Sequence, residues 1–129
     1  MKDLKLSIEI SRELASSVLG LNVVYTESCE HRDNIIGIWT DMNTKPIKEI
    51  SIYEFAFKCK EWAYTNKYRL SSGQHRLNTK QEHYINNQIA SYFCSVYYIT
   101  NDDSDIQIDA NTEPEAIFKA CQWILENSK

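Results

Sequence analysis

Residues 51–62 read SIYEFAFKCKEW and residues 112–123 read TEPEAIFKACQW, and these two stretches decide the fold. Each begins with a hydroxyl residue followed three positions later by glutamate. This is the capping box that marks a helix start, because the hydroxyl accepts a first-turn amide and the glutamate reaches back. Each stretch then places Phe, Lys and Trp at matching offsets. The sequence therefore predicts one helix over about 52–66 and another over 113–127.

The two predicted helices differ in where their apolar residues fall. The core stripe of the first follows the helical period and consists of Ile52, Phe55, Ala56, Cys59, Trp62 and Ala63. Tyr53, Phe57 and Tyr64 fall on another side of that helix, roughly 100–140° from Ile52 at about 100° per residue. Either a second layer covers these aromatic residues or they face outward. The last helix has a stripe of Ile117, Ala120, Cys121 and Ile124, with no equivalent aromatic side.

The rest of the chain adds a further helix and several strands. A first helix is predicted over 8–19, with Ile8, Ala15, Val18 and Leu19 on its apolar face, Leu14 at the border and Gly20 as its C-terminal cap. Strands are predicted over 21–26, 35–40, 68–72, 91–99 and 106–110, and turns at 43–46 and 101–104. Residues 73–90 are polar. Within them, Thr79–Glu82 is compatible with the start of a helix that carries Tyr84, Ile85 and Ile89.

This order of elements predicts an α+β protein. Strands joined by short turns pair antiparallel, and helices cover the resulting sheet. We therefore expect one antiparallel sheet of about four or five strands with three helices packed over it. The chain of 129 residues is long enough for a core and short for two domains, so residues 1–129 are expected to form a single domain.

Composition argues against several classes of partner. The chain has 18 acidic and 14 basic residues, a net charge of −4, and no cluster of Lys and Arg. Direct nucleic-acid binding is therefore disfavoured. No apolar run approaches the ~18 residues that a membrane span requires. The four cysteines lie far apart and no signal peptide precedes them, which favours reduced thiols in a soluble, cytoplasmic protein.

No motif predicts catalysis, a metal or a cofactor. Cys29 and His31 are the one place where Cys and His lie close together, but a zinc site needs about four ligands. If that segment is extended, both side chains point to the same side, so a small cysteine-dependent enzyme stays open as an alternative, as does a ligand-binding domain with a tyrosine-lined pocket. The acidic run from Asp102 to Asp109 lacks the glycine and terminal glutamate of a calcium loop and is interpreted as a hairpin turn.

The residues most indicative of function are therefore surface residues. Exposed aromatic side chains with an acidic rim are typical of protein interfaces. Tyr53, Phe57 and Tyr64 are the candidate contact residues, and the candidate acidic rim consists of Asp102, Asp103 and Asp105. The acidic turn would steer a partner with a basic surface, such as a protein that handles nucleic acid.

The segment 112–121 is similar to the P-E-A-I-x-x-A ending of small phage and prophage proteins of the "ABA sandwich" type, and the helix over 53–63 is compatible with that group. The resemblance implies a phage-derived accessory protein and brings no catalytic residues. We expect a non-enzymatic protein that binds and inhibits a host protein, in its sharpest form a component of a bacterial defence system (anti-CRISPR-like). A structural, homo-oligomeric phage component is the other reading in this class.

Overall fold

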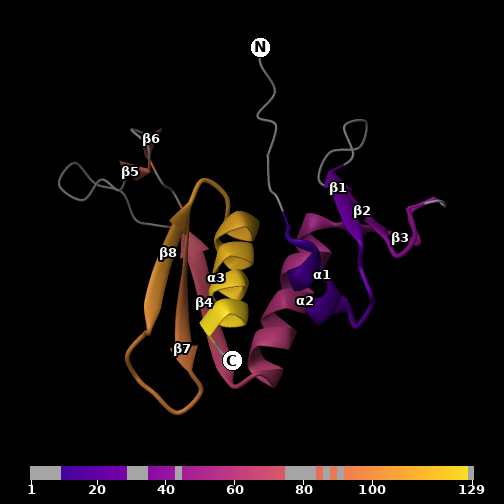
Figure 1. Ribbon diagram of the computed structural model, residues 1–129. Coiled ribbons are helices and arrows are strands. Elements are labelled where there is room, and N and C mark those ends of the chain that lie inside the picture. The colour runs from indigo at the N-terminus through magenta and orange to yellow at the C-terminus, as the bar shows by residue number, and fades with distance from the viewer. Residues whose placement is uncertain are drawn as a thin grey trace. The chain divides into compact units, whose positions relative to one another are not determined.

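The computed structural model describes residues 10–28, 35–42, 45–74, 84–85, 88–89 and 92–127. Their elements run in the order α1 (Arg12–Leu19), β1 (Tyr25–Ser28), β2 (Ile35–Trp39), β3 (Lys48–Ser51), α2 (Ile52–Thr65), β4 (Tyr68–Gln74), β5 (Tyr84–Ile85), β6 (Gln88–Ile89), β7 (Tyr92–Tyr98), β8 (Ile106–Ala110) and α3 (Glu113–Asn127) (Figure 1). The chain divides into two compact units, Met1–Lys58 and Cys59–Lys129, and α2 contributes residues to both. The single domain expected from chain length stays a prediction.

The α+β class is confirmed, but the expected single sheet is wrong. The described strands form two three-stranded antiparallel sheets, β1-β2-β3 and β4-β7-β8, and a short β5-β6 pair. The sequence did not predict β3, because Ile50 is its one buried apolar residue and the strand lacks apolar alternation. With β3 in place, the first sheet is complete before α2 begins. The 14 residues of α2, a helix about 21 Å long at roughly 1.5 Å per residue, then precede β4.

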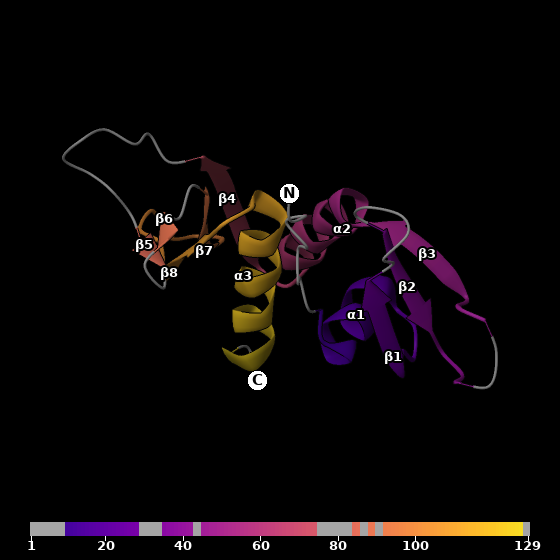
Figure 2. The same ribbon diagram turned by 90° about the horizontal axis from the view of Figure 1, so that it is seen from above.

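In the first unit, α1 packs against the sheet β1-β2-β3 (Figure 2). Ser11 caps the helix, since its hydroxyl accepts from the Leu14 amide at 3.1 Å, and Gly20 ends it with a φ of 69° as predicted. Leu14, placed at the border of the apolar face, is instead 1 % exposed and central to the core. The buried hydrophobic residues of this unit are Ile10, Leu14, Ala15, Val23, Ile36, Ile38, Ile50, Ile52, Phe55 and Ala56.

The first strand begins four residues later than predicted, at Tyr25. The hydroxyl of Ser16, on α1, accepts a hydrogen bond from the Val23 amide at 3.0 Å. This bond ties residue 23 to the helix. Regular pairing with β2 then follows, from Tyr25↔Trp39 to Ser28↔Ile36. A local contact with a neighbouring helix thus overrides the β-propensity of the residues before Tyr25.

In the second unit, α3 lies against the sheet β4-β7-β8 (Figure 1). Near its start, Glu113 Oε2 accepts a hydrogen bond from the Ser72 hydroxyl at 2.6 Å. Near its end, the Trp123 ring meets the Tyr68 ring edge-on, with 6.2 Å between centroids. The buried residues of this unit are Cys59, Ala63, Cys94, Ser95, Val96, Ala110, Pro114, Ala116, Ile117, Phe118, Ala120, Cys121 and Ile124. They include the whole stripe predicted for the last helix.

The two capping motifs that opened the sequence are present in both helices. The Ser51 hydroxyl accepts from the Glu54 amide at 3.0 Å, and the Thr112 hydroxyl accepts from the Glu115 amide at 3.3 Å. The Glu115 carboxylate lies 3.3 Å from Lys119 Nζ, one turn further along the helix. The hydroxyl half of each capping box is therefore confirmed, and it sets where each helix begins.

The helix considered for the polar middle of the chain is wrong for its described residues. Tyr84 and Ile85 form β5, which pairs antiparallel with Gln88 and Ile89 of β6. Residues 79–82, proposed as the start of that helix, lie outside the described residues. Ile85 and Ile89 are four residues apart, a spacing that fits a short hairpin as well as a helix period, so a segment this short does not distinguish the two structures.

Candidate functional site

The three aromatic residues singled out on the first capped helix are exposed in the structure. Tyr53, Phe57 and Tyr64 are 61 %, 63 % and 61 % exposed, and we call them the aromatic face of α2. At about 100° per residue they lie within roughly 40° of one another around the helix axis. The opposite side of the helix is buried at Ile52, Phe55, Ala56, Cys59 and Ala63. Of the two alternatives left by the sequence, the outward-facing stripe is therefore the correct one.

The second capped helix shows that this exposure is not imposed by the motif. Phe118 occupies in α3 the offset that Phe57 occupies in α2, yet Phe118 is 3 % exposed. In α3 burial extends around the helix from Ala116 through Phe118, beyond the predicted stripe. The aromatic face is thus a property of α2 alone among these two helices. Three large aromatic side chains are therefore exposed on one side of one helix. A cluster of this kind is unusual for a surface that binds no partner.

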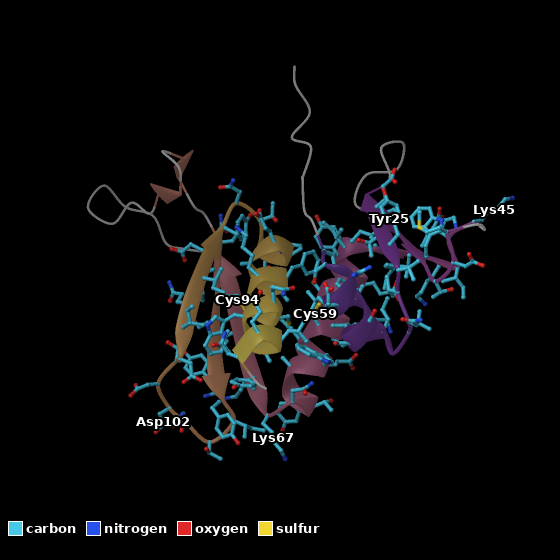
Figure 3. The ribbon with its side chains drawn as sticks, viewed as in Figure 1. Tyr25, Lys45, Cys59, Lys67, Cys94 and Asp102 are labelled. Atoms are coloured by element: carbon cyan, nitrogen blue, oxygen red, sulfur yellow. The ribbon has the colours of Figure 1, made fainter. Side chains whose placement is uncertain are left out.

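The acidic turn lies where the sequence placed it. Asp102, Asp103 and Asp105 are exposed in the connection between β7 and β8, at the tip of that hairpin (Figure 3). The Asp105 amide donates to the Val96 carbonyl at 2.7 Å, and the Asn101 amide donates to the Tyr98 carbonyl at 2.9 Å. The turn is therefore held by its own backbone, and its three carboxylates project a concentrated negative charge.

Backbone contacts bring this turn to the end of α2 that carries Tyr64. The Lys67 amide donates to the Tyr64 carbonyl at 3.0 Å, and the Lys67 carbonyl accepts from the Ile99 amide at 2.8 Å. Lys67 has a φ of 76°, which turns the chain sharply from the helix into β4. Lys67 and Asp102 accordingly lie at the same end of the second unit (Figure 3). Tyr64, the last residue of the aromatic face, therefore lies at the same end of the second unit as the acidic turn.

The cysteines divide into one outside the described residues and three inside the core. Cys29 and His31, the alternative catalytic pair, lie outside the described residues. Cys59, Cys94 and Cys121 are free thiols, and each is fully buried. The Cys121 thiol donates to the Cys59 carbonyl at 3.5 Å. The neighbouring Cys59 side chain, together with burial, raises the pKa of Cys121. These three thiols act as small apolar residues of the core.

The burial of Cys94 should make the free energy of unfolding depend on pH above about pH 8. Burial raises the pKa of the Cys94 thiol from 9.0 to about 12. Above pH 9 the unfolded chain loses this proton while the native state keeps it, so stability falls as pH rises through that window. The loss is about 1.4 kcal/mol between pH 8 and pH 10. Urea unfolding at both pH values should show a smaller loss for Cys94→Ala, and parallel losses would contradict the assignment.

Metal-binding clusters and membrane-spanning helices are two further features that indicate a class of function. Among residues 10–28, 35–42, 45–74, 84–85, 88–89 and 92–127, no group of three or more His, Cys, Asp or Glu side chains is arranged to hold a metal ion. None of the helices described there is both long and apolar enough to cross a bilayer. Comparisons with known protein families, with curated proteins and with solved structures find no match to this chain.

The strands β1 and β2 carry a second pair of aromatic residues, which the sequence did not predict as a surface. Tyr25 on β1 and Trp39 on β2 are opposite one another in the register, and their ring centroids lie 5.2 Å apart. Tyr25 is 37 % exposed. Each residue stood in a strand that had been predicted, but the pairing register joins them, and nothing local in the sequence specifies that register.

Proposed function

We propose that this chain is a non-enzymatic protein that works by binding another protein through the aromatic face of α2. The observation that carries the proposal is the exposure of Tyr53, Phe57 and Tyr64, each above 60 %, on one side of one helix. Aromatic residues supply much of the binding energy at protein interfaces, because they bury a large area at a small cost in side-chain entropy.

The size of this face supports a protein partner. At roughly 200 Å² per aromatic side chain, the exposed fractions add to about 400 Å². This is about half of the roughly 800 Å² that each partner contributes to a standard interface. The neighbouring side chains of the helix, among them Glu54 and Glu61, are exposed and polar, as the rim of an interface is.

The charge of the neighbouring turn narrows the class of partner. The whole chain has a net charge of −4, and Asp102, Asp103 and Asp105 concentrate negative charge at this turn, which favours approach by a basic surface. A protein that handles nucleic acid carries such a surface. The remaining part of the proposal comes from the resemblance to phage and prophage proteins. We propose that the partner is a host protein in the bacterial cytoplasm and that this chain inhibits it. The most specific form of the proposal is that this host protein is a component of a bacterial defence system.

A photo-crosslinking residue placed at position 57 should trap the partner. We expect a crosslinked species from bacterial lysate at position 57 and none at position 119, where Lys119 gives a matched exposed position on α3. Once the partner is isolated, Phe57→Ala should weaken its binding by about 2 kcal/mol, or roughly 30-fold, as truncation of an interface hot spot does. Titration calorimetry of the purified pair measures this change.

The same experiment separates the competing classes. Equal crosslinking at positions 57 and 119 would contradict a specific face on α2. A crosslinked product with twice the mass of the chain, together with a dimer mass by light scattering, would replace a host partner with a second copy of this chain. Unchanged affinity after Phe57→Ala and Tyr64→Ala would place the interface elsewhere.

A further inference from the structure

Figure 2 shows the strands β1, β2 and β3 together with α1. The register of these strands gathers aromatic and acidic residues on the outer face of the sheet, opposite the face that carries the buried Ile36 and Ile38. The register places Tyr25 beside Trp39, and Gly37 between Glu27 and Glu49. Alternation along each strand puts all five residues on one face, because side chains two residues apart point the same way. Tyr25, Glu27 and Glu49 are exposed, and Trp39 is partly exposed.

The indole of Trp39 lies over Gly37 and so between the two carboxylate-bearing strands. A Cβ atom added at Gly37 would lie 2.9 Å from Trp39 Cζ3 and 3.0 Å from Cη2. The glycine thus makes room for the ring to lie close to the sheet. Neighbouring strands are about 4.8 Å apart, so Glu27 and Glu49 stand on the two strands on either side of Gly37, the residue over which the ring lies.

Tyr25 closes one side of this arrangement and fixes one of the carboxylates. Its hydroxyl donates to Glu27 Oε1 at 2.5 Å. That hydrogen bond is the main reason the pKa of Tyr25 is raised. The Glu27 charge is therefore held at the edge of an aromatic pair. Lys48, the basic residue within these strands, alternates with Glu49 and belongs to the opposite face.

We propose that this outer face, formed by Tyr25, Glu27, Gly37, Trp39 and Glu49, binds an arginine side chain of a partner protein. A cation over an indole face is attracted by the ring quadrupole, and two flanking carboxylates add charge complementarity. The site consists of residues of β1, β2 and β3, shares no residue with the aromatic face of α2, and stands independently of it.

The chemistry of the face favours guanidinium. Guanidinium is planar and weakly hydrated, so it stacks on aromatic rings while its N–H groups reach carboxylates at the ring edge. Elsewhere in this chain, the Arg69 guanidinium lies over the Tyr97 ring, 4.4 Å from its centre. A compact ammonium makes a point contact and cannot stack, which ranks lysine below arginine here.

The test is a titration of the full-length protein, followed by NMR, with N-acetylarginine amide as the probe and its neutral isostere N-acetylcitrulline amide as the matched control. The chain has three tryptophans, so its indole N–H signals provide two internal references. We expect a saturable shift of the Trp39 indole with the arginine probe, weakened by added salt, while Trp62 and Trp123 stay unchanged. Citrulline should give no shift.

Variants separate the two halves of the site. Glu27→Gln with Glu49→Gln should weaken the arginine probe about fivefold, because two exposed charge pairs are lost. Glu13→Gln with Glu126→Gln removes the same charge from exposed positions on α1 and α3 and should have no effect. Gly37→Ala keeps both carboxylates but displaces the indole, and should also weaken binding. Equal shifts with citrulline, equal loss in the two charge variants, or no saturable Trp39 shift would each overturn the proposal.

Discussion

Replacing Phe118 by alanine is expected to lower the free energy of unfolding by about 3–5 kcal/mol, whereas Phe57→Ala should change it by no more than about 0.5 kcal/mol. The two residues follow equivalent capping hydroxyls at the same offset, and each is followed by lysine. Helix propensity therefore costs the same in both variants and cancels in the comparison. The expected difference between the two variants therefore comes from burial, because Phe118 is 3 % exposed and Phe57 is 63 % exposed.

Urea unfolding of both variants, followed by circular dichroism, measures this difference directly. The midpoint should move for Phe118→Ala and stay near the wild-type value for Phe57→Ala. A large loss in Phe57→Ala would mean that the aromatic face of α2 is packed against the protein itself, and the proposed interface would then be wrong. Equal small losses would mean that the α3 side of the core is loosely packed.

The helices could be predicted closely because their signals are local. Ser51 and Thr112 each supply a hydroxyl for a first-turn amide, and both helix starts were located to the residue. Gly20 ends α1 by adopting a left-handed conformation that other residues resist. Each of these effects depends on residues within one turn of the chain, so the sequence contains all the information needed.

Burial around each helix was only partly predictable. The helical period separated Tyr53 and Phe57 from the core stripe of α2, and the structure places both in solvent. The same reasoning left Phe118 outside the stripe of α3, where it is nevertheless buried. A helical wheel gives the relative directions of side chains, but the width of the buried arc depends on which elements cover the helix, and that is a tertiary property.

Sheet composition and the outer-face site depend on pairing between distant residues. Nothing in residues 48–51 marks a strand, yet β3 completes the first sheet by pairing with β2. The same register brings Glu27 and Glu49 to either side of Gly37. A shift of one residue in either pairing would send these carboxylates to the other face. The site could therefore be recognised only after the pairing was known.

In the variant Cys29→Ser, the remaining three thiols are expected to react with a thiol reagent at least about 10³-fold more slowly in the native protein than in denaturant. Cys59, Cys94 and Cys121 each have no exposed surface, so reaction requires an opening that costs several kcal/mol. Burial also raises the pKa of Cys94 to about 12, which removes the reactive thiolate at pH 8. Stopped-flow absorbance with an aromatic disulfide reagent gives both rates.

The wild-type chain then tests the enzymatic alternative with the same reagent. Since the three core thiols are protected, a single fast reaction that disappears in Cys29→Ser assigns a reactive thiolate to Cys29, which a cysteine-dependent enzyme requires. No fast reaction in the wild type removes that alternative, because a thiol nucleophile must be accessible and deprotonated. A fast reaction that survives Cys29→Ser would contradict the burial of the core thiols, and with it the packing of α3 over its sheet.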